Sequence, residues 1–159
     1  RVLVDAPCSG TGTYRRNPDL KWRFGEEELN RINDIQKSVL RSAAKMLKPG
    51  GRLVYSTCSI LKRENQDVIE EFLKENEDFE LLDAFDILQK QGVEINPYQK
   101  KRCGEYFVML PHLNKTDGFF GAVLQKKRAE KPSKRLTQNT PENAEAEKPA
   151  EKKAEEAAK

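Results

Sequence analysis

Two cysteines of this 159-residue sequence lie in polar segments that directly follow short apolar runs. Cys8 lies within residues 5–12, which follow the apolar run 1–4, and Cys58 lies within residues 56–59. The thiolate form of cysteine is a nucleophile that can form a covalent bond to a substrate. The two segments therefore predict covalent chemistry, provided that the fold brings them together.

The third cysteine, Cys103, lacks such a setting, and we expect it to be a small, buried hydrophobic side chain. Three cysteines at wide spacing fit neither a disulfide framework nor a zinc site, so no metal is expected. Free thiols are typical of a reducing compartment, and they predict a cytoplasmic protein. In the two polar segments, helix N-termini or the cations Lys62 and Arg63 are expected to lower the pKa of a thiol.

The elements expected around the two segments alternate along the chain. Apolar runs and helical spacing predict strands over 1–4, 53–55, 79–82 and 119–125 and helices over 26–48 and 64–76. This succession is typical of a parallel α/β sheet with right-handed crossovers. Ligands bind at the carboxyl ends of such strands, so adjacent first and second strands would place both thiols in one crevice. The stretch 90–104 is expected to be a loop.

Each expected helix carries an apolar stripe that should pack against the sheet. In the first helix the stripe consists of Leu29, Ile32, Ile35, Val39, Leu40, Ala43, Met46 and Leu47. In the second it consists of Val68, Ile69, Phe72 and Leu73.

Charge is distributed unevenly along the chain. Residues 1–63 hold 13 basic and 6 acidic side chains, residues 64–125 hold 6 and 13, and residues 126–159 hold 10 and 7. A polyanion would therefore meet the first third, although the net charge is only +3. No apolar run approaches the ~20 residues of a membrane span, and no signal peptide is evident. Residues 127–159 are rich in Pro, Glu, Lys and Ala and are expected to form a disordered tail.

Further segments of distinctive sequence accompany the two cysteine motifs. The relevant segments are Asp5-Ala6-Pro7-Cys8-Ser9, Arg15-Arg16-Asn17-Pro18-Asp19-Leu20-Lys21-Trp22, Ser56-Thr57-Cys58-Ser59, Pro111-His112 and Thr116-Asp117-Gly118-Phe119-Phe120. Together they resemble the Nop/Sun family of RNA cytosine-C5 methyltransferases, and most of all its bacterial ribosomal-RNA branch, the RsmB (Sun/Fmu) proteins. The resemblance implies that residues 1–126 are the C-terminal part of a Rossmann-like, class I methyltransferase domain that uses S-adenosylmethionine.

The resemblance also implies a role for individual residues. Carbon 5 of cytosine is a poor nucleophile, and a thiolate that adds to carbon 6 activates it toward the methyl group of S-adenosylmethionine. In the family the thiol of the Thr-Cys-Ser motif attacks, which assigns Cys58, and the thiol of the Pro-Cys motif assists product release, which assigns Cys8. Asp5 would contact cofactor, base or both, and Pro7 would line the base pocket. The implied substrate is an unpaired or flipped cytosine of 16S rRNA, bound by a monomer.

Four cations just after the first cysteine motif are expected to contact RNA phosphates. Such contacts position the RNA without reading its sequence. They are Arg15, Arg16, Lys21 and Arg23. The alternative for them is a solvated loop. Trp22 could stack on a base, but we expect it to pack against the helix that follows. His112, the only histidine, is expected to be structural.

In the family, a glycine-rich turn and acidic strand ends that hold the cofactor precede the Asp-Ala-Pro-Cys segment. This sequence has no such segment, and it begins at Arg1 within an expected strand. We therefore expect it to be the back part of a longer protein. Alone it should be inactive and poorly folded, because half of the sheet would lack its hydrogen-bond partners.

Three other functions remain open. In a DNA cytosine-C5 methyltransferase, Cys8 would be the nucleophile and Cys58 incidental. A noncatalytic RNA-binding fragment would bind through its basic face and would not depend on either cysteine. A redox pair of Cys8 and Cys58 would form a disulfide at mild potential, although a Cys-x-x-Cys motif is missing.

Overall fold

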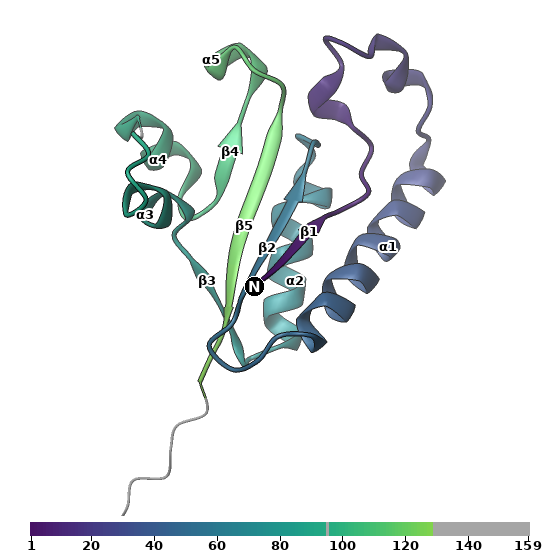
Figure 1. Ribbon diagram of the computed structural model, residues 1–159. Helices are drawn as coiled ribbons and strands as arrows, with labels where there is room; N and C mark the ends of the chain where they lie inside the picture. The colour runs from purple at the N-terminus through teal and green to yellow at the C-terminus, as the bar shows by residue number, and fades with distance from the viewer. Residues whose placement is uncertain (95, 129–159) are drawn as a thin grey trace, which may run out of the picture. The chain divides into compact units, whose positions relative to one another are not determined.

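Five strands form one open sheet in the computed structural model, which describes residues 1–94 and 96–128 (Figure 1). They are β1 (Val2–Asp5), β2 (Arg52–Thr57), β3 (Phe79–Leu82), β4 (Phe107–Met109) and β5 (Phe119–Lys126). β2 lies between β1 and β5. The other edge of β5 pairs with β3 along one half and with β4 along the other. The four strands expected from the sequence are confirmed, and β4 is an addition.

The sheet is mixed, whereas the sequence predicted a parallel one. β1 and β2 are parallel, but β5 runs antiparallel to both β2 and β3. The cause is the connection that precedes β5. β4 ends at the carboxyl edge of β2, and the short helix α5 (Pro111–Asn114) with the turn at 116–118 returns the chain from that edge. A strand entered from there must run in the opposite direction, so only β1, β2 and β3 follow the expected pattern.

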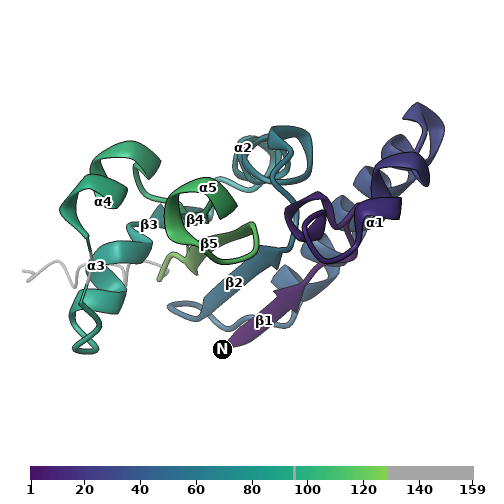
Figure 2. The same ribbon diagram turned by 90° about the horizontal axis from the view of Figure 1, so that it is seen from above.

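Two helices cover one face of the sheet. α1 (Glu26–Lys45) follows β1, α2 (Gln66–Glu75) follows β2, and both lie on the same side in Figure 2. The core between these helices and the sheet includes Val4, Leu53, Tyr55, Val68, Ile69, Phe72, Phe120, Ala122 and Leu124. The two helices predicted from the sequence are thus confirmed, each slightly shorter than expected.

The stripe with which α1 faces the sheet differs from the expected one. Its buried apolar residues are Leu40, Ala43 and Ala44, and Leu47 is buried just beyond its end. Ile35, Val39 and Met46, which were expected to face inward, are exposed. The first half of the helix buries Asn33 and Gln36 in their place, because their amide groups hydrogen-bond to the carbonyl oxygens of Arg63 and Pro7. The helix therefore turns a polar face toward the loops that carry the cysteines.

Short helices were not predicted from the sequence. α3 (Ala84–Gln89) begins at a cap in which the Asp83 carboxylate accepts hydrogen bonds from the N–H groups of Phe85 and Asp86. α4 (Pro97–Cys103) lies in the stretch predicted to be a loop, and Asn96 caps it in the same way. Helices this short carry too little periodicity to be seen in a sequence, and their caps do much to define them.

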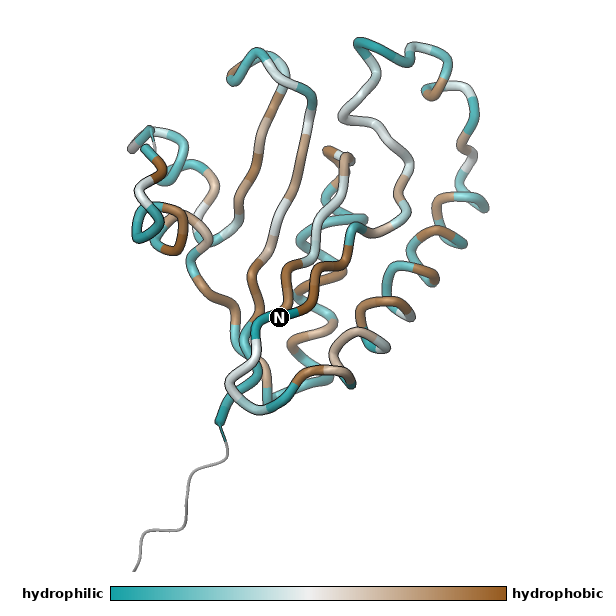
Figure 3. The backbone as a smooth tube through the Cα atoms, viewed as in Figure 1, coloured by the Kyte–Doolittle hydropathy of each residue, from teal (hydrophilic) through white to brown (hydrophobic). Residues whose placement is uncertain are grey.

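Polar loops gather at the carboxyl edge of β1 and β2. In the hydropathy colouring of Figure 3, the lower halves of both strands are brown, and the loop that follows β1 is mostly white or teal. That loop contains two short 3-10 turns, η1 (Thr11–Thr13) and η2 (Pro18–Trp22). The predicted tail, residues 127–159, lies outside the described residues from position 129 onward, and at its start the Lys127 N–H donates to the Asp78 carbonyl.

Candidate active site

The two thiols expected to share a crevice are in contact. β1 and β2 are neighbours, with Asp5 opposite Ser56 near their carboxyl ends, and Cys8 follows β1 by three residues while Cys58 directly follows β2. Cys8 Sγ lies 3.3 Å from Cys58 Sγ. Both side chains are half-buried and neither is in a disulfide. The prediction that the two motifs meet at one level of the sheet edge is confirmed.

Backbone hydrogen bonds join the two cysteine loops to each other and to the turn before β5. The Gly12 N–H donates to the Cys58 carbonyl at 2.9 Å, and the Gly12 carbonyl accepts from the Gly118 N–H at 2.8 Å. A Cβ atom at Gly12 would lie 2.6 Å from the Cys58 oxygen and 2.8 Å from the Gly118 carbonyl carbon. Only glycine fits where these three segments meet.

A buried carboxylate accepts hydrogen bonds from both cysteine loops. Glu64 has no exposed surface, and its Oε2 accepts hydrogen bonds from the hydroxyls of Ser9 and Ser59, which directly follow the two cysteines. Its Oε1 accepts from the Ser9 N–H at 2.8 Å and from Gln36 Nε2 at 3.4 Å. Four donors match the four acceptor positions of an ionised carboxylate.

Asn65 holds the second cysteine loop from its other side. Its Oδ1 accepts from the Thr57 hydroxyl at 2.6 Å, and its Nδ2 donates to the Ser59 carbonyl at 2.8 Å. These bonds fix the residues on both sides of Cys58. Asn65, Glu64 and Gln36 were not among the site residues predicted from the sequence. The only available signal was a Glu-Asn pair at the start of an amphipathic helix, and nothing in that pattern indicates burial.

Burial, together with the neighbouring Cys58 thiol, raises the pKa of the Cys8 thiol to about 12, and a hydrogen bond from the Gly10 backbone opposes the change. The expectation that this pKa would be lowered is wrong for Cys8. The cations proposed for that effect are engaged elsewhere, because Lys62 pairs with Asp67 at 3.1 Å and Arg63 pairs with Glu26 at 2.7 Å.

Asp5 and Pro7, the other two residues assigned to the site, are both exposed. The Asp5 carboxylate accepts a hydrogen bond from the Ser56 hydroxyl at 3.3 Å. It lies at one end of an apolar cleft of about 500 Å³ on the face of the sheet opposite α1 and α2, and Leu3, Phe107 and Phe119 are among the cleft's lining residues.

The basic segment, residues 15–23, contains both paired and unpaired cations. Arg16 pairs with Asp117, and Arg23 pairs with Asp19 at 2.6 Å. Arg15 and Lys21 are exposed and make no ion pair with any residue that the structure describes. The expectation that Trp22 packs against α1 is wrong, because its side chain is 82% exposed on η2.

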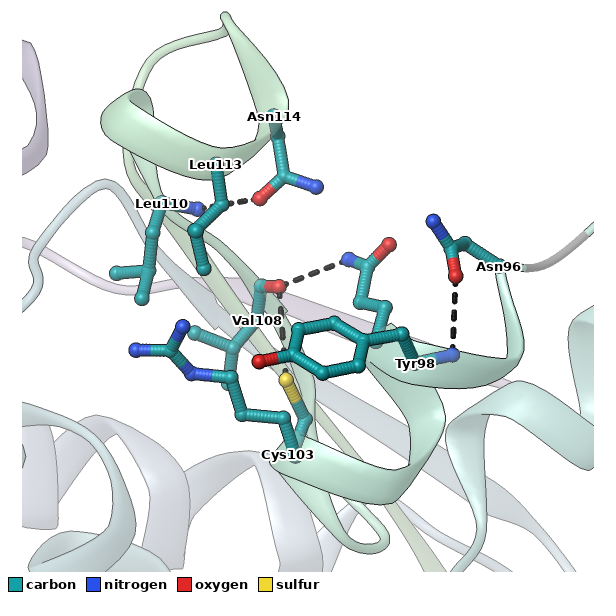
Figure 4. Close-up of a pocket in the computed structure, with 9 residues that line it drawn as sticks. Asn96, Tyr98, Cys103, Val108, Leu110, Leu113 and Asn114 are labelled. Carbon is teal, nitrogen blue, oxygen red and sulfur yellow. Dashed lines mark hydrogen bonds between the residues drawn. The ribbon is translucent and has the colours of Figure 1, made fainter.

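Cys103 and His112 are the remaining residues that the sequence singled out. Cys103 is half-buried rather than buried, and burial raises its pKa. It lines a small pocket of about 110 Å³ with Tyr98 and Val108 (Figure 4). The His112 side chain is exposed on α5 and makes no hydrogen bond within residues 1–94 and 96–128, so the expectation of a structural histidine is wrong. No group of acidic, His and Cys side chains suited to a metal, and no helix long and apolar enough to cross a membrane, occurs in the described part of the chain.

The sequence is similar to those of several known proteins. The chain is 42% identical over 127 residues to a probable ribosomal RNA small subunit methyltransferase B of Bacillus subtilis (strain 168). It is 41% identical over 128 residues to a ribosomal RNA small subunit methyltransferase B of Klebsiella pneumoniae (strain 342). Each alignment covers 80% of this chain but only 27% and 26% of the respective relative.

The structure also resembles a solved one. NSun6 from Pyrococcus horikoshii, solved with SFG, superposes with a TM-score of 0.62 at 27% identity, over 80% of this chain and 30% of that one. Residues 1–125 match the sequence profile of the 16S rRNA methyltransferase RsmB/F family. The two cysteine motifs, their contact at the sheet edge and this match agree, and the chain belongs to the RsmB/F family of 16S rRNA methyltransferases.

Proposed function

We propose that this chain carries the thiol-bearing part of an enzyme that methylates carbon 5 of a cytosine in 16S rRNA, with S-adenosylmethionine as methyl donor. The observation that carries the proposal is the 3.3 Å contact between the Cys8 and Cys58 sulfur atoms. The substrate class is supported by the names of the relatives, which are ribosomal RNA small subunit methyltransferases.

Cys58 is the proposed nucleophile. Its thiolate would add to carbon 6 of the cytosine, and carbon 5 would then bond to the methyl group while the bond from that group to the donor sulfur breaks. Loss of the carbon 5 proton and cleavage of the bond from Cys58 Sγ to carbon 6 restore the aromatic ring. The base has to lie outside a helical stack for this attack, as an unpaired or flipped cytosine does.

Cys8 is the proposed partner in product release. Because burial raises its pKa to about 12, the Cys8 thiol keeps its proton at neutral pH. A protonated thiol 3.3 Å from Cys58 Sγ can donate a hydrogen bond to that sulfur as it leaves carbon 6. The same property makes Cys8 a poor nucleophile, which argues against a mechanism of the DNA methyltransferase type.

The described residues fit one part of the cofactor. When bound, S-adenosylmethionine supplies an electrophilic methyl group. Its ammonium group suits the Asp5 carboxylate, which is one of the residues lining the apolar cleft and accepts a hydrogen bond from the Ser56 hydroxyl. The NSun6 relative was solved with SFG, an analogue of S-adenosylmethionine, which supports S-adenosylmethionine as the cofactor class. Pro7, exposed next to Cys8, is the proposed wall of the base pocket.

The basic segment is the proposed contact to the RNA backbone. Arg15 and Lys21 are the stronger candidates, because both are exposed and neither is held by a carboxylate within the described residues. Arg16 and Arg23 would have to exchange Asp117 and Asp19 for phosphate.

The test uses a hybrid protein in which the matched part of this chain replaces the corresponding 128 residues of the Klebsiella pneumoniae relative. The Cys8→Ala hybrid is mixed with ribosomal RNA and S-adenosylmethionine and run on a denaturing gel. We expect a protein–RNA adduct that disappears when Cys58→Ser is added, because release is impaired while attack remains.

Other outcomes point to the alternatives. Activity that is lost in Cys8→Ala and kept in Cys58→Ser would assign attack to Cys8, as in the DNA enzymes. RNA binding without methyl transfer, unchanged in both variants, would indicate a noncatalytic RNA-binding fragment. A Cys8–Cys58 disulfide that forms and breaks reversibly at mild potential, with no methyl transfer, would indicate the redox pair.

A further inference from the structure

The most exposed large aromatic side chain among the described residues lies on the active-site loop. Trp22 is 82% exposed, and it is the only tryptophan of the chain. Because so little of its surface packs against the protein, the indole is free to contact a ligand. Exposed aromatic rings are the groups on which proteins stack unpaired nucleic-acid bases.

Trp22 is held in a defined place relative to the thiols. It ends the turn η2, in which the Arg23 N–H donates to the Leu20 carbonyl at 3.1 Å. The side chain of Leu20 packs against Gly10, two residues after Cys8, and leaves only 3.1 Å to the position of a Cβ atom there. The indole is therefore carried by a turn that is anchored on the Cys8 loop.

The charges around the indole suit a polyanion that carries bases. Lys21 Nζ lies 4.9 Å from the centre of the Trp22 ring, a cation–π arrangement. Arg15 is exposed on the same loop, and neither it nor Lys21 is neutralised by a carboxylate in the part of the chain that the structure describes. An ammonium group beside an aromatic ring offers a phosphate contact and a stacking surface to one nucleotide.

We propose that Trp22, with Lys21 beside it, is a stacking site for an unpaired base of the RNA substrate, next to the cytosine that reaches the thiols. This inference rests on the proposed function, since it takes the polyanion to be RNA. It assigns base binding to Trp22, for which the sequence favoured packing against the following helix, in a segment whose cations were predicted to contact phosphates.

The chain provides its own reporter, because emission from its sole tryptophan comes from Trp22. The 159-residue chain is titrated with a single-stranded oligoribonucleotide and, separately, with inorganic polyphosphate of matched charge. We expect saturable quenching of the emission by RNA and no quenching by polyphosphate. Quenching by both would reduce the effect to charge, and absence of quenching by RNA would overturn the proposal.

Variants separate stacking from charge. Trp22→Ala is expected to weaken RNA binding at least about tenfold, and Trp22→Phe to keep the affinity within about threefold, because a phenyl ring still stacks. The dependence of log Kd on log salt should be unchanged in Trp22→Ala. In Arg15→Gln, the control for a phosphate contact, this slope should fall by about one. Equal loss of affinity in the Phe and Ala variants would contradict stacking.

The hybrid distinguishes failure of this inference from failure of the proposed function. In the hybrid, Trp22→Ala should raise KM for RNA about tenfold and leave KM for S-adenosylmethionine unchanged. Normal methyl transfer with an unchanged KM for RNA would reject the stacking site and leave the proposed function intact. If RNA quenches the emission of the chain but the hybrid transfers no methyl group, the stacking site stands and the proposed function is rejected.

Discussion

Glu64 has no exposed surface, and all of its close polar neighbours are donors, so its identity is narrowly constrained. Glu64→Gln keeps the shape but replaces one acceptor oxygen with an amide that points N–H groups at other donors. We expect this variant to lower the free energy of unfolding by about 1–3 kcal/mol, measured by urea denaturation. We also expect oxidation of Cys8 and Cys58 to a disulfide to slow several-fold, because Ser9 and Ser59 no longer share an anchor.

The control for this variant removes the same charge nearby. Glu70 is exposed on α2, and Glu70→Gln should change neither stability nor the rate of disulfide formation. If Glu64→Gln lowers stability but leaves disulfide formation at its normal rate, Glu64 supports the fold without positioning the thiols.

The environment of Cys8 predicts an unusual pH profile. Alkylation requires the thiolate, and burial raises the pKa of this thiol from its ordinary 9.0 to about 12. Burial, the largest cause of the shift, remains in Cys58→Ser, so iodoacetamide should modify Cys8 in this variant at least about tenfold more slowly at pH 8 than it modifies free cysteine. The rate should still climb at pH 10, where free cysteine has levelled off. Peptide mapping by mass spectrometry measures it, and a plateau below pH 9 would contradict the prediction.

At the scale of elements, the site depends on three segments that meet at Gly12. A methyl group at that position collides with backbone atoms of the Cys58 loop and of the turn before β5, and backbone cannot move aside as a flexible side chain can. Gly12→Ala is expected to lower the free energy of unfolding by about 1–3 kcal/mol and to separate the two thiols. Gly121→Ala is the control, because the Cβ atom there would meet Phe107 at an ordinary 3.6 Å. Similar stability of the two variants in urea would show that the junction yields easily.

Some elements and site contacts could be predicted from the sequence, and others could not. Strong patterns were sufficient for β1, β2, α1 and α2, and the alternation of strand and helix was sufficient to bring Cys8 and Cys58 together. Side-chain networks were beyond reach, because the burial of Glu64 follows from donors distant in sequence. The direction of β5 depends on the short connection through α5, and the exposure of Trp22 depends on a turn anchored through Leu20. Neither leaves a periodic pattern.

At the scale of the whole molecule, one face of the sheet is covered by α1 and α2 and the other holds an apolar cleft. Leu3, in the strand at the edge of the sheet, is 69% exposed, and the cleft beside it has a volume of about 500 Å³. Apolar surface of this extent marks a place where further protein or ligand packs. The chain spans about a quarter of the length of the relatives it matches, so their remaining residues are the proposed cover.

This arrangement predicts a clear difference between the chain alone and the hybrid. The chain alone should transfer no methyl group to ribosomal RNA and should bind the dye ANS, which reports exposed apolar surface. The hybrid should methylate and bind little ANS, because the relative's own segments cover the cleft. A tritium-transfer assay and dye titration on both proteins measure this. Robust methyl transfer by residues 1–159 would show that the cleft needs no cover. An inactive hybrid that still binds ANS would show that the two parts fail to pack, and Leu3→Glu, expected to reduce dye binding in the chain alone, would then confirm where the dye sits.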